Sequence, residues 1–241
     1  MVAHDYPRLV SLWRRLARQA GFSMREIART CGYPVYGVST APAGTPPWGY
    51  ISAGIHGDEP AGAWGLLEWA GRHAERLKRR EWLLMPCLNP PGLVANSRLD
   101  SRGRDLNRSF HLGNIPLVRG WRKFVGDRRF PGPVIALHED YDGDGIYVYY
   151  VGDNPAVARD GIAAAGRIIR PSMNPRVDRK WRQEGGIVRL PRVRRVPKGV
   201  EGGYLLLRHA DSFTTFETPS EAALELRVRA HVAYLDSVTG E

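Results

Sequence analysis

The sequence has few cysteines and no long apolar run, and both shortages exclude classes of protein. Cys31 and Cys87 are its two cysteines, too few and too far apart for a disulfide framework or a cysteine-based zinc knuckle. No apolar run approaches the roughly 18 to 20 residues of a transmembrane helix. Charged residues interrupt the first 20 positions, unlike a signal peptide. We therefore expect a cytoplasmic protein with reduced cysteines.

Acidic residues are also in the minority. The chain of 241 residues has 35 Lys and Arg against 25 Asp and Glu, a formal net charge of +10, on a background that is 43% hydrophobic. This hydrophobic content excludes a disordered polymer, and the length suits one domain of ordinary core size. We predict a single domain over residues 1–241, with a helical lead-in at 1–34 and an α/β core at 35–241.

Two short helices are expected in the lead-in. Apolar residues recur at three- to four-residue steps between Leu9 and Ala20, which predicts an amphipathic helix. Ser23 is suited to an N-cap and Glu26 to the matching capping-box position. A second helix should therefore end near Gly32.

The rest of the chain alternates between short apolar runs and helical patterns. This alternation is the α/β signature, and one sheet can take all the strands. The expected strands are residues 35–39, 50–55, 82–88, 134–137, 146–151, 204–207 and 213–216. The expected helices are residues 60–77, about 117–125, 155–169 and a last one that begins at Pro219.

The segment ISAGIHGDEPAG at 51–62 predicts a strand, a glycine turn and a helix, with His56 and Glu59 in the turn. Imidazole and carboxylate groups at the carboxyl end of a strand are good zinc ligands. The alternative reading is that His56 hydrogen-bonds the turn and Glu59 stabilises the helix N-terminus. His138 is the best third ligand because it directly follows an apolar run, although it could also be a core histidine.

Three further segments carry candidate groups. The loop at 88–110 contains Arg98, Asn107 and Arg108, and arginine matches the planar geometry of a carboxylate. Glu217 follows an apolar run and precedes a proline, where it could cap a helix or act as a general base. The aspartates at 140, 142 and 144 imitate the start of a calcium loop, but the glutamate that closes such a loop is missing.

Together these motifs resemble the zinc carboxypeptidase superfamily, which includes metallocarboxypeptidases, murein-peptide amidases and the succinylglutamate desuccinylase and aspartoacylase group. The resemblance covers about residues 50–220. In chain order, the matching motifs are HxxE at 56–59, NPxG at 89–92, Arg98, DLNR at 105–108, His138 and Glu217 in ETP. It implies an α/β fold with a mixed sheet flanked by helices on both faces, and it makes residues 35–241 the catalytic core.

The resemblance also implies a metal site. By this likeness, His56, Glu59 and His138 bind one zinc ion. Asp105 supports His56 by fixing its tautomer.

The same likeness implies roles toward substrate. Arg98 stabilises the developing oxyanion, while Asn107 and Arg108 hold the terminal carboxylate. Glu217 deprotonates a zinc-bound water. For the tyrosine that closes over substrate in many members, Tyr204 is a candidate, with the tyrosines at 147, 149 and 150 as alternatives.

The implied activity is zinc-dependent hydrolysis of the C-terminal amide bond of a small peptide with a free carboxylate. Asp58 gives the HGDE form of the amidase and acylase branches. Only about 24 residues follow Glu217, too few for the extra β domain of the aspartoacylase branch, and this favours the peptidase or amidase branch. Deacylation of an N-acyl amino acid is the alternative reading.

Two remoter hypotheses belong to other classes. The basic segment at 181–200, with Arg189, Arg192, Arg194, Arg195 and Lys198, suggests a nucleic-acid-binding protein, but no nucleic-acid-binding motif accompanies it. A metal-binding interaction protein without activity is the other. Retention of every matched catalytic position, Glu217 included, argues against it.

Overall fold

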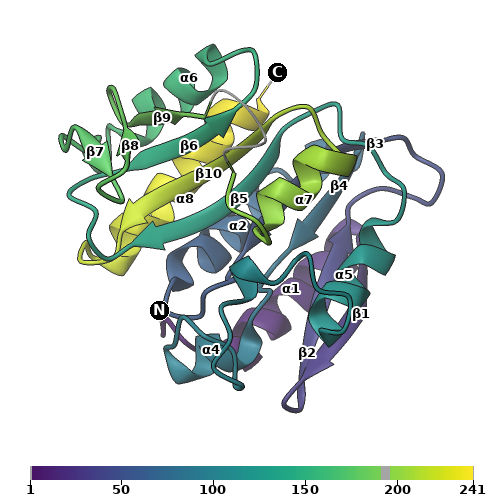
Figure 1. The fold of residues 1–241 in the computed structure, drawn as a ribbon. Coiled ribbons are helices and arrows are strands. Elements are labelled where there is room, and N and C mark those ends of the chain that lie inside the picture. Colours follow the sequence, from purple (N-terminus) through teal and green to yellow (C-terminus); the bar gives the residue numbers. More distant parts are fainter. Residues whose placement is uncertain (1, 191–195, 241) are drawn as a thin grey trace.

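Eight strands form one mixed β-sheet, and helices cover both of its faces (Figure 1). The structure is a computed structural model that describes residues 2–190 and 196–240. The strand order is β1-β2-β4-β3-β5-β10-β6-β9. The strands are β1 (Ser23–Thr30), β2 (Tyr33–Ser39), β3 (Pro47–Ala53), β4 (Glu81–Met85), β5 (Val134–Asp140), β6 (Tyr147–Val151), β9 (Ile187–Arg189) and β10 (Phe213–Pro219), with β7 (Arg176–Val177) and β8 (Trp181–Arg182) in a separate hairpin.

The described helices lie in two layers around this sheet. They are α1 (Tyr6–Ala20), α2 (Pro60–Arg72), α3 (Ala74–Leu77), α4 (Pro90–Ala95), α5 (Pro116–Val125), α6 (Ala156–Ala165), α7 (Glu201–Arg208) and α8 (Leu224–Thr239), with one short 3-10 turn, η1 (Leu106–Arg108). The predicted fold class, a mixed sheet flanked by helices on both faces, is confirmed.

Each face of the sheet has its own buried hydrophobic cluster, because side chains alternate between the two faces along each strand. Ile135 and Leu137 of β5 pack with α1, α2, α6 and α8. Val134 and Ala136 of the same strand pack with α5 and α7 instead. The central parallel strands β4, β3, β5 and β10 thereby end at one edge between these layers.

The helix expected at 23–32 is wrong, because these residues form the edge strand β1. Glu26 pairs with Tyr36 of β2 across an antiparallel ladder. Ser23 accepts a hydrogen bond from the Arg25 side chain at 3.2 Å rather than capping a helix. Cys31 and Gly32 both have positive φ and turn the chain into β2, so pairing between strands overrides the local capping pattern. The lead-in is therefore helical only in α1.

The strand expected at 204–207 is also wrong. Residues 201–208 form α7, where Leu205 and Leu206 are buried and Leu207 is 68% exposed. The periodicity of a short apolar run does not separate a strand from a buried helix turn. The last helix begins at Leu224 rather than at Pro219, because β10 continues through Pro219. Among the described residues, no helix is long and apolar enough to cross a membrane.

Candidate metal centre and its cavity

The HxxE motif lies in the turn that joins β3 to α2. Gly54 has a φ of +63°, and a Cβ at Gly57 would lie 1.9 Å from the backbone carbon of Gly92. The turn therefore packs directly on the NPxG segment, in which Asn89 Oδ1 accepts the N–H of Gly92 at 3.1 Å. Gly54 needs to be glycine because of its positive φ, and Gly57 because the two backbones meet without room for a side chain.

Three buried side chains converge at this turn. His56 Nδ1 lies 2.5 Å from Glu59 Oε1, and His138 Nδ1 lies 2.8 Å from Glu59 Oε2. Ligand atoms of all three residues lie within 4.8 Å of one another. Within the described part of the chain, no other group of three His, Cys, Asp or Glu comes so close together.

The donor set fits a divalent metal. His56 Nδ1 faces both Glu59 and the guanidinium of Arg98, at 2.5 and 3.2 Å. Burial by itself lowers the pKa of His56, but the carboxylates of Glu59 and Asp105 together outweigh it and raise this pKa to about 9. Two imidazoles and one carboxylate aimed at a common point are a zinc ligand set with a position left open. His56, Glu59 and His138 would hold such an ion.

Asp105 and Arg98 lie around the outer side of His56. Asp105 Oδ1 is 3.3 Å from His56 Nε2, so this carboxylate faces the nitrogen opposite the converging atoms. Arg98 Nη2 donates to Asp105 Oδ2 at 3.1 Å, and Arg98 Nη1 lies 3.5 Å from Glu59 Oε1. A carboxylate beside this nitrogen can accept its N–H and so fix the tautomer of the histidine.

Glu217 and His138 occupy paired positions on neighbouring parallel strands, β10 and β5. Both side chains line the cavity. Burial, reinforced by the charges of Glu59 and two aspartates, raises the pKa of Glu217 from 4.5 to about 8. Among the described residues, the Glu217 carboxylate has no hydrogen-bond partner, so its oxygens remain available to a bound molecule.

A cavity of about 210 Å³ extends from the ligand trio. Arg98, Asn107 and Arg108 line it together with the trio and Glu217. Asn107 and Arg108 come from η1, where Asn107 Oδ1 accepts the N–H of Glu201 at 3.0 Å. The side-chain amide nitrogen of Asn107 is thereby left as the available donor.

The structure does not bring Tyr204 to the cavity. Its ring stacks on His209 and contacts the guanidinium groups of Arg122 and Arg208. Tyr147 and Tyr149 of β6 do line the cavity. Their hydroxyls donate to Asp140 at 2.8 Å and to Asp178 at 2.6 Å, respectively.

Tyr150 does not line the cavity either, since its hydroxyl donates to a backbone carbonyl of the next loop. Two of the three aspartates that imitate a calcium loop accept hydrogen bonds from hydroxyl groups. Asp144 accepts from Ser172 at 2.5 Å and Asp140 from Tyr147.

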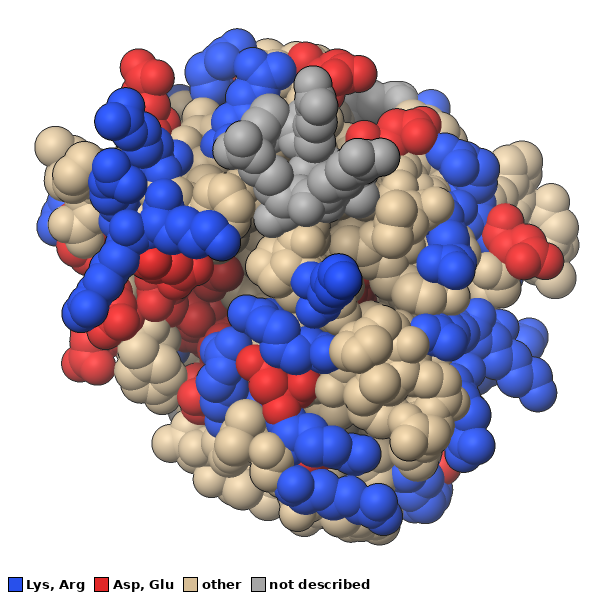
Figure 2. Space-filling view, in the orientation of Figure 1, with Lys and Arg blue, Asp and Glu red and all other residues tan. Residues whose placement is uncertain are grey.

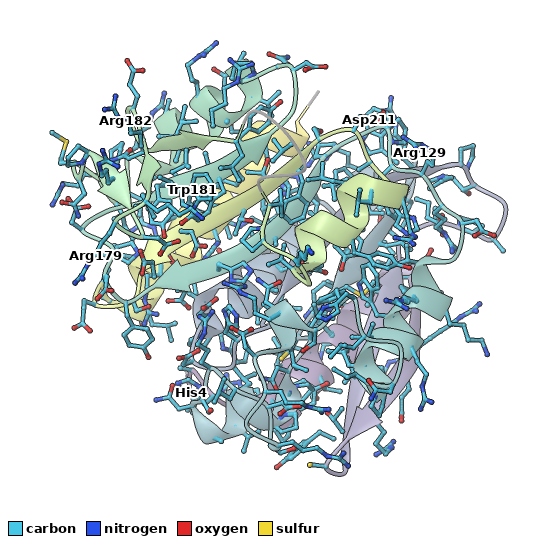
Figure 3. The ribbon with its side chains drawn as sticks, viewed as in Figure 1. His4, Arg129, Arg179, Trp181, Arg182 and Asp211 are labelled. Atoms are coloured by element: carbon cyan, nitrogen blue, oxygen red, sulfur yellow. The ribbon has the colours of Figure 1, made fainter. Side chains whose placement is uncertain are left out.

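Asp178, Trp181 and Glu201 line the cavity, and motif reasoning did not single them out. Trp181 extends from β8 toward the middle of the sheet, whereas Arg179 and Arg182 lie toward the outer edge (Figure 3). The positions of these residues in the sequence do not indicate that they line a cavity, because the β7–β8 hairpin and α7 reach the cavity only through long-range packing.

Basic side chains spread over the face of the molecule seen in Figure 2, and an acidic area lies near the carboxyl ends of β5 and β10. Arg192, Arg194 and Arg195 of the basic segment lie outside the described residues. Arg189 is exposed at the end of β9. The basic character is thus distributed rather than confined to one segment.

Solved structures share this architecture. A protein from Shewanella amazonensis SB2B, named provisionally as a metallopeptidase, is 24% identical with a TM-score of 0.84, over 98% of this chain and 93% of its own. The chain has a zinc carboxypeptidase-like fold. Carboxypeptidase A from Helicoverpa armigera shares the fold at 13% identity and a TM-score of 0.73, over 98% and 72% of the two chains.

A metallo-carboxypeptidase from Pseudomonas aeruginosa, solved with (2-guanidinoethylmercapto)succinic acid, is 15% identical with a TM-score of 0.63, over 93% and 66% of the two chains. Residues 47–114 match the family model of the succinylglutamate desuccinylase/aspartoacylase catalytic domain. No curated protein matches the sequence. The family match and the zinc carboxypeptidase-like fold together support the predicted superfamily.

Proposed function

We propose that the protein is a zinc-dependent hydrolase that cleaves the C-terminal amide bond of a small peptide with a free carboxylate. One observation carries most weight: the buried His56, Glu59 and His138 share a cavity with Glu217 and with Arg108. Metal ligands, a base and a carboxylate-binding cation are the parts that such a hydrolase needs.

Asn107 and Arg108 would bind the substrate's terminal carboxylate. Arg108 lines the cavity and presents a planar guanidinium, which can make two parallel hydrogen bonds to one carboxylate. The amide nitrogen of Asn107 adds a neutral donor beside it. A fixed carboxylate would place the last amide bond at a constant distance from the ligand trio.

Arg98 and Glu217 would act on the scissile bond. A zinc ion, when bound, supplies Lewis acidity and lowers the pKa of a water to about 7. Glu217 would accept a proton from the water that adds to the carbonyl carbon, and would return this proton to the amine nitrogen as the C–N bond breaks. Arg98 donates to the carbonyl oxygen as negative charge develops there, since its guanidinium already lies beside Glu59.

Elemental analysis of protein prepared without chelator tests the metal. We expect about one zinc per chain, held by the trio. A preparation with no stoichiometric transition metal that also fails to bind added zinc would refute the proposal. His73→Ala is a matched control, because His73 lies at the opposite end of α2 from the trio, where it contacts Asp236, and its loss should leave the zinc content unchanged.

Deacylation of an N-acyl amino acid is the second candidate, and the family-model match over residues 47–114 favours it. Both reactions break an amide bond next to a free carboxylate, so the same cavity suits either. A screen against C-terminal peptides, muropeptides and N-acyl amino acids separates them. Cleavage of peptides alone supports the first reading, and cleavage of acyl amino acids alone supports the second.

A further inference from the structure

Glu201 is a second buried glutamate in the wall of the cavity. It is the first residue of α7 and is 1% exposed. No arginine or lysine among the described residues forms an ion pair with it, and burial raises its pKa. Glutamate is rarely buried without a pairing partner, so its contacts require an explanation.

Both carboxylate oxygens of Glu201 are bound by hydroxyls of β3. Tyr50 donates to Oε1, and Ser52 donates to Oε2 at 2.7 Å. Trp121 of α5 in turn donates its indole N–H to the Tyr50 hydroxyl at 2.7 Å. The start of α7 is thereby attached to the strand that leads into the HxxE turn.

The backbone of Glu201 holds a cavity residue from the other side. Its N–H donates to Asn107 Oδ1 at 3.0 Å. Val200 at the N-cap makes no side-chain hydrogen bond, so Asn107 supplies the cap from a distant segment.

The loop before α7 is pressed against η1 at the same place. The N–H of Phe110 donates to the carbonyl of Gly199 at 2.8 Å. A Cβ at Gly199 would lie 2.3 Å from the Arg108 carbonyl oxygen. This close approach keeps the first N–H of α7 within reach of Asn107.

We propose that Glu201 is a positioning residue: by anchoring the first turn of α7 to Tyr50 and Ser52, it fixes the orientation of Asn107 in the cavity. The inference rests on the proposed function, in which the Asn107 nitrogen binds the substrate's carboxylate. An amide that rotates freely presents oxygen as often as nitrogen, and the oxygen would repel a carboxylate. Engagement of Oδ1 by the Glu201 N–H selects the productive orientation.

A carboxylate suits this role because it is an acceptor only. Two hydroxyl donors on one strand can both be satisfied by its oxygens, and charge-assisted hydrogen bonds are stronger than neutral ones. Glutamine at this position can still accept from Tyr50, while its NH₂ can face the oxygen of Ser52. Alanine would remove the acceptor to which both hydroxyls donate.

The test compares Glu201→Ala and Glu201→Gln in the full-length, zinc-loaded protein. Glu225→Ala is the matched control, because Glu225 lies in the first turn of α8 and is exposed. Kinetics are measured on a peptide substrate from the screen and on its C-terminal amide. Hydrogen exchange of the Glu201-position N–H and zinc content are measured in parallel.

For Glu201→Ala we expect KM for the free acid to rise about tenfold with kcat within about twofold, the pattern of lost uniform binding. Cleavage of the amide should change little. Glu201→Gln should restore KM to within about twofold of the wild type, and all variants should keep their zinc. A loss of kcat alone, an equal loss on the amide, or a Gln variant as poor as Ala would overturn the proposal.

Failure of the proposed function has a different signature. If the screen yields no substrate, hydrogen exchange still tests the positioning role of Glu201. We expect the N–H at position 201 to exchange at least about tenfold faster in Glu201→Ala, and to stay protected in Glu201→Gln. Unchanged exchange in Ala would overturn the positioning role. Should Glu201→Ala not fold, Ser52→Ala removes one of the two donors, and an unchanged KM and exchange rate there would likewise overturn it.

Discussion

The carboxyl ends of β5 and β10 present two buried glutamates on opposite faces of the same sheet. Glu217 points into the cavity. Glu139, one position beyond His138, borders the cavity with its backbone, where its N–H donates to Glu59 Oε2 at 3.2 Å. Its carboxylate points toward α2 and α8, where it accepts the N–H of Ala61 at 2.6 Å and pairs with Arg227. Burial raises the pKa of both carboxyls, to about 8 and about 7 respectively.

The difference between the two faces lies in what packs against them. Helices close one face, so Glu139 has a cation and a backbone donor that stabilise its charge. The cavity face leaves Glu217 exposed to a bound molecule and without such partners. Strand alternation places the two carboxylates on opposite faces, and the packing of each face makes Glu139 structural and leaves Glu217 suited to proton transfer.

Replacement of Glu217 should have the largest effect on activity. Glu217→Gln keeps the shape but cannot accept a proton, so kcat should fall at least about 100-fold. Zinc content, measured by elemental analysis, should stay the same because Glu217 is not one of the converging ligands. Near-normal turnover, or loss of the metal, would show that Glu217 has another role.

Breaking the ion pair on the helix face should cost stability rather than activity. Arg227→Leu leaves Glu139 buried without its cation, and we expect the free energy of unfolding to fall by about 3 to 5 kcal/mol. Urea denaturation measures this change, and the zinc content should be unaffected. The double variant with Glu139→Leu should recover much of the loss; a double variant as unstable as the single one would contradict the comparison.

The pH dependence of stability sharpens the comparison further. Between about pH 4.5 and 8 the unfolded chain has lost the proton of Glu217, whereas the folded, metal-free chain still holds it. Stability should therefore fall as pH rises through this interval, by up to about 1.4 kcal/mol per unit. Glu217→Gln should fall less steeply in urea titrations at several pH values, and identical slopes would be inconsistent with the raised pKa.

Substitution of Arg108 should have the smallest effect. Arg108→Lys keeps the charge but loses the planar pair of donors, so kcat/KM should fall about tenfold, mainly through KM. Amidated substrates should be insensitive to the change, since they lack the carboxylate. Unchanged kcat/KM on the free acid, or amides cleaved as well as acids, would remove the carboxypeptidase assignment.

Much of the fold could be predicted from local patterns, because periodicity and turn residues report directly on strands and helices. The runs before His138 and Glu217 are strands, as expected, and the helix after Glu59 begins at Pro60. The capping pattern at Ser23 misled because an edge strand takes its hydrogen bonds from a partner strand. Residues 204–207 misled because a short buried run fits either structure.

The sequence by itself determined the order of the motifs, the alternation of strands and helices, and the candidate ligands His56, Glu59 and His138. Tertiary structure alone decided that these atoms meet within 4.8 Å and that Tyr204 packs on His209 instead of reaching the cavity. It also brought Glu201 to Asn107 across 94 positions. Local spacing encodes the face on which a side chain lies, whereas contacts between distant segments depend on how strands pair and helices pack.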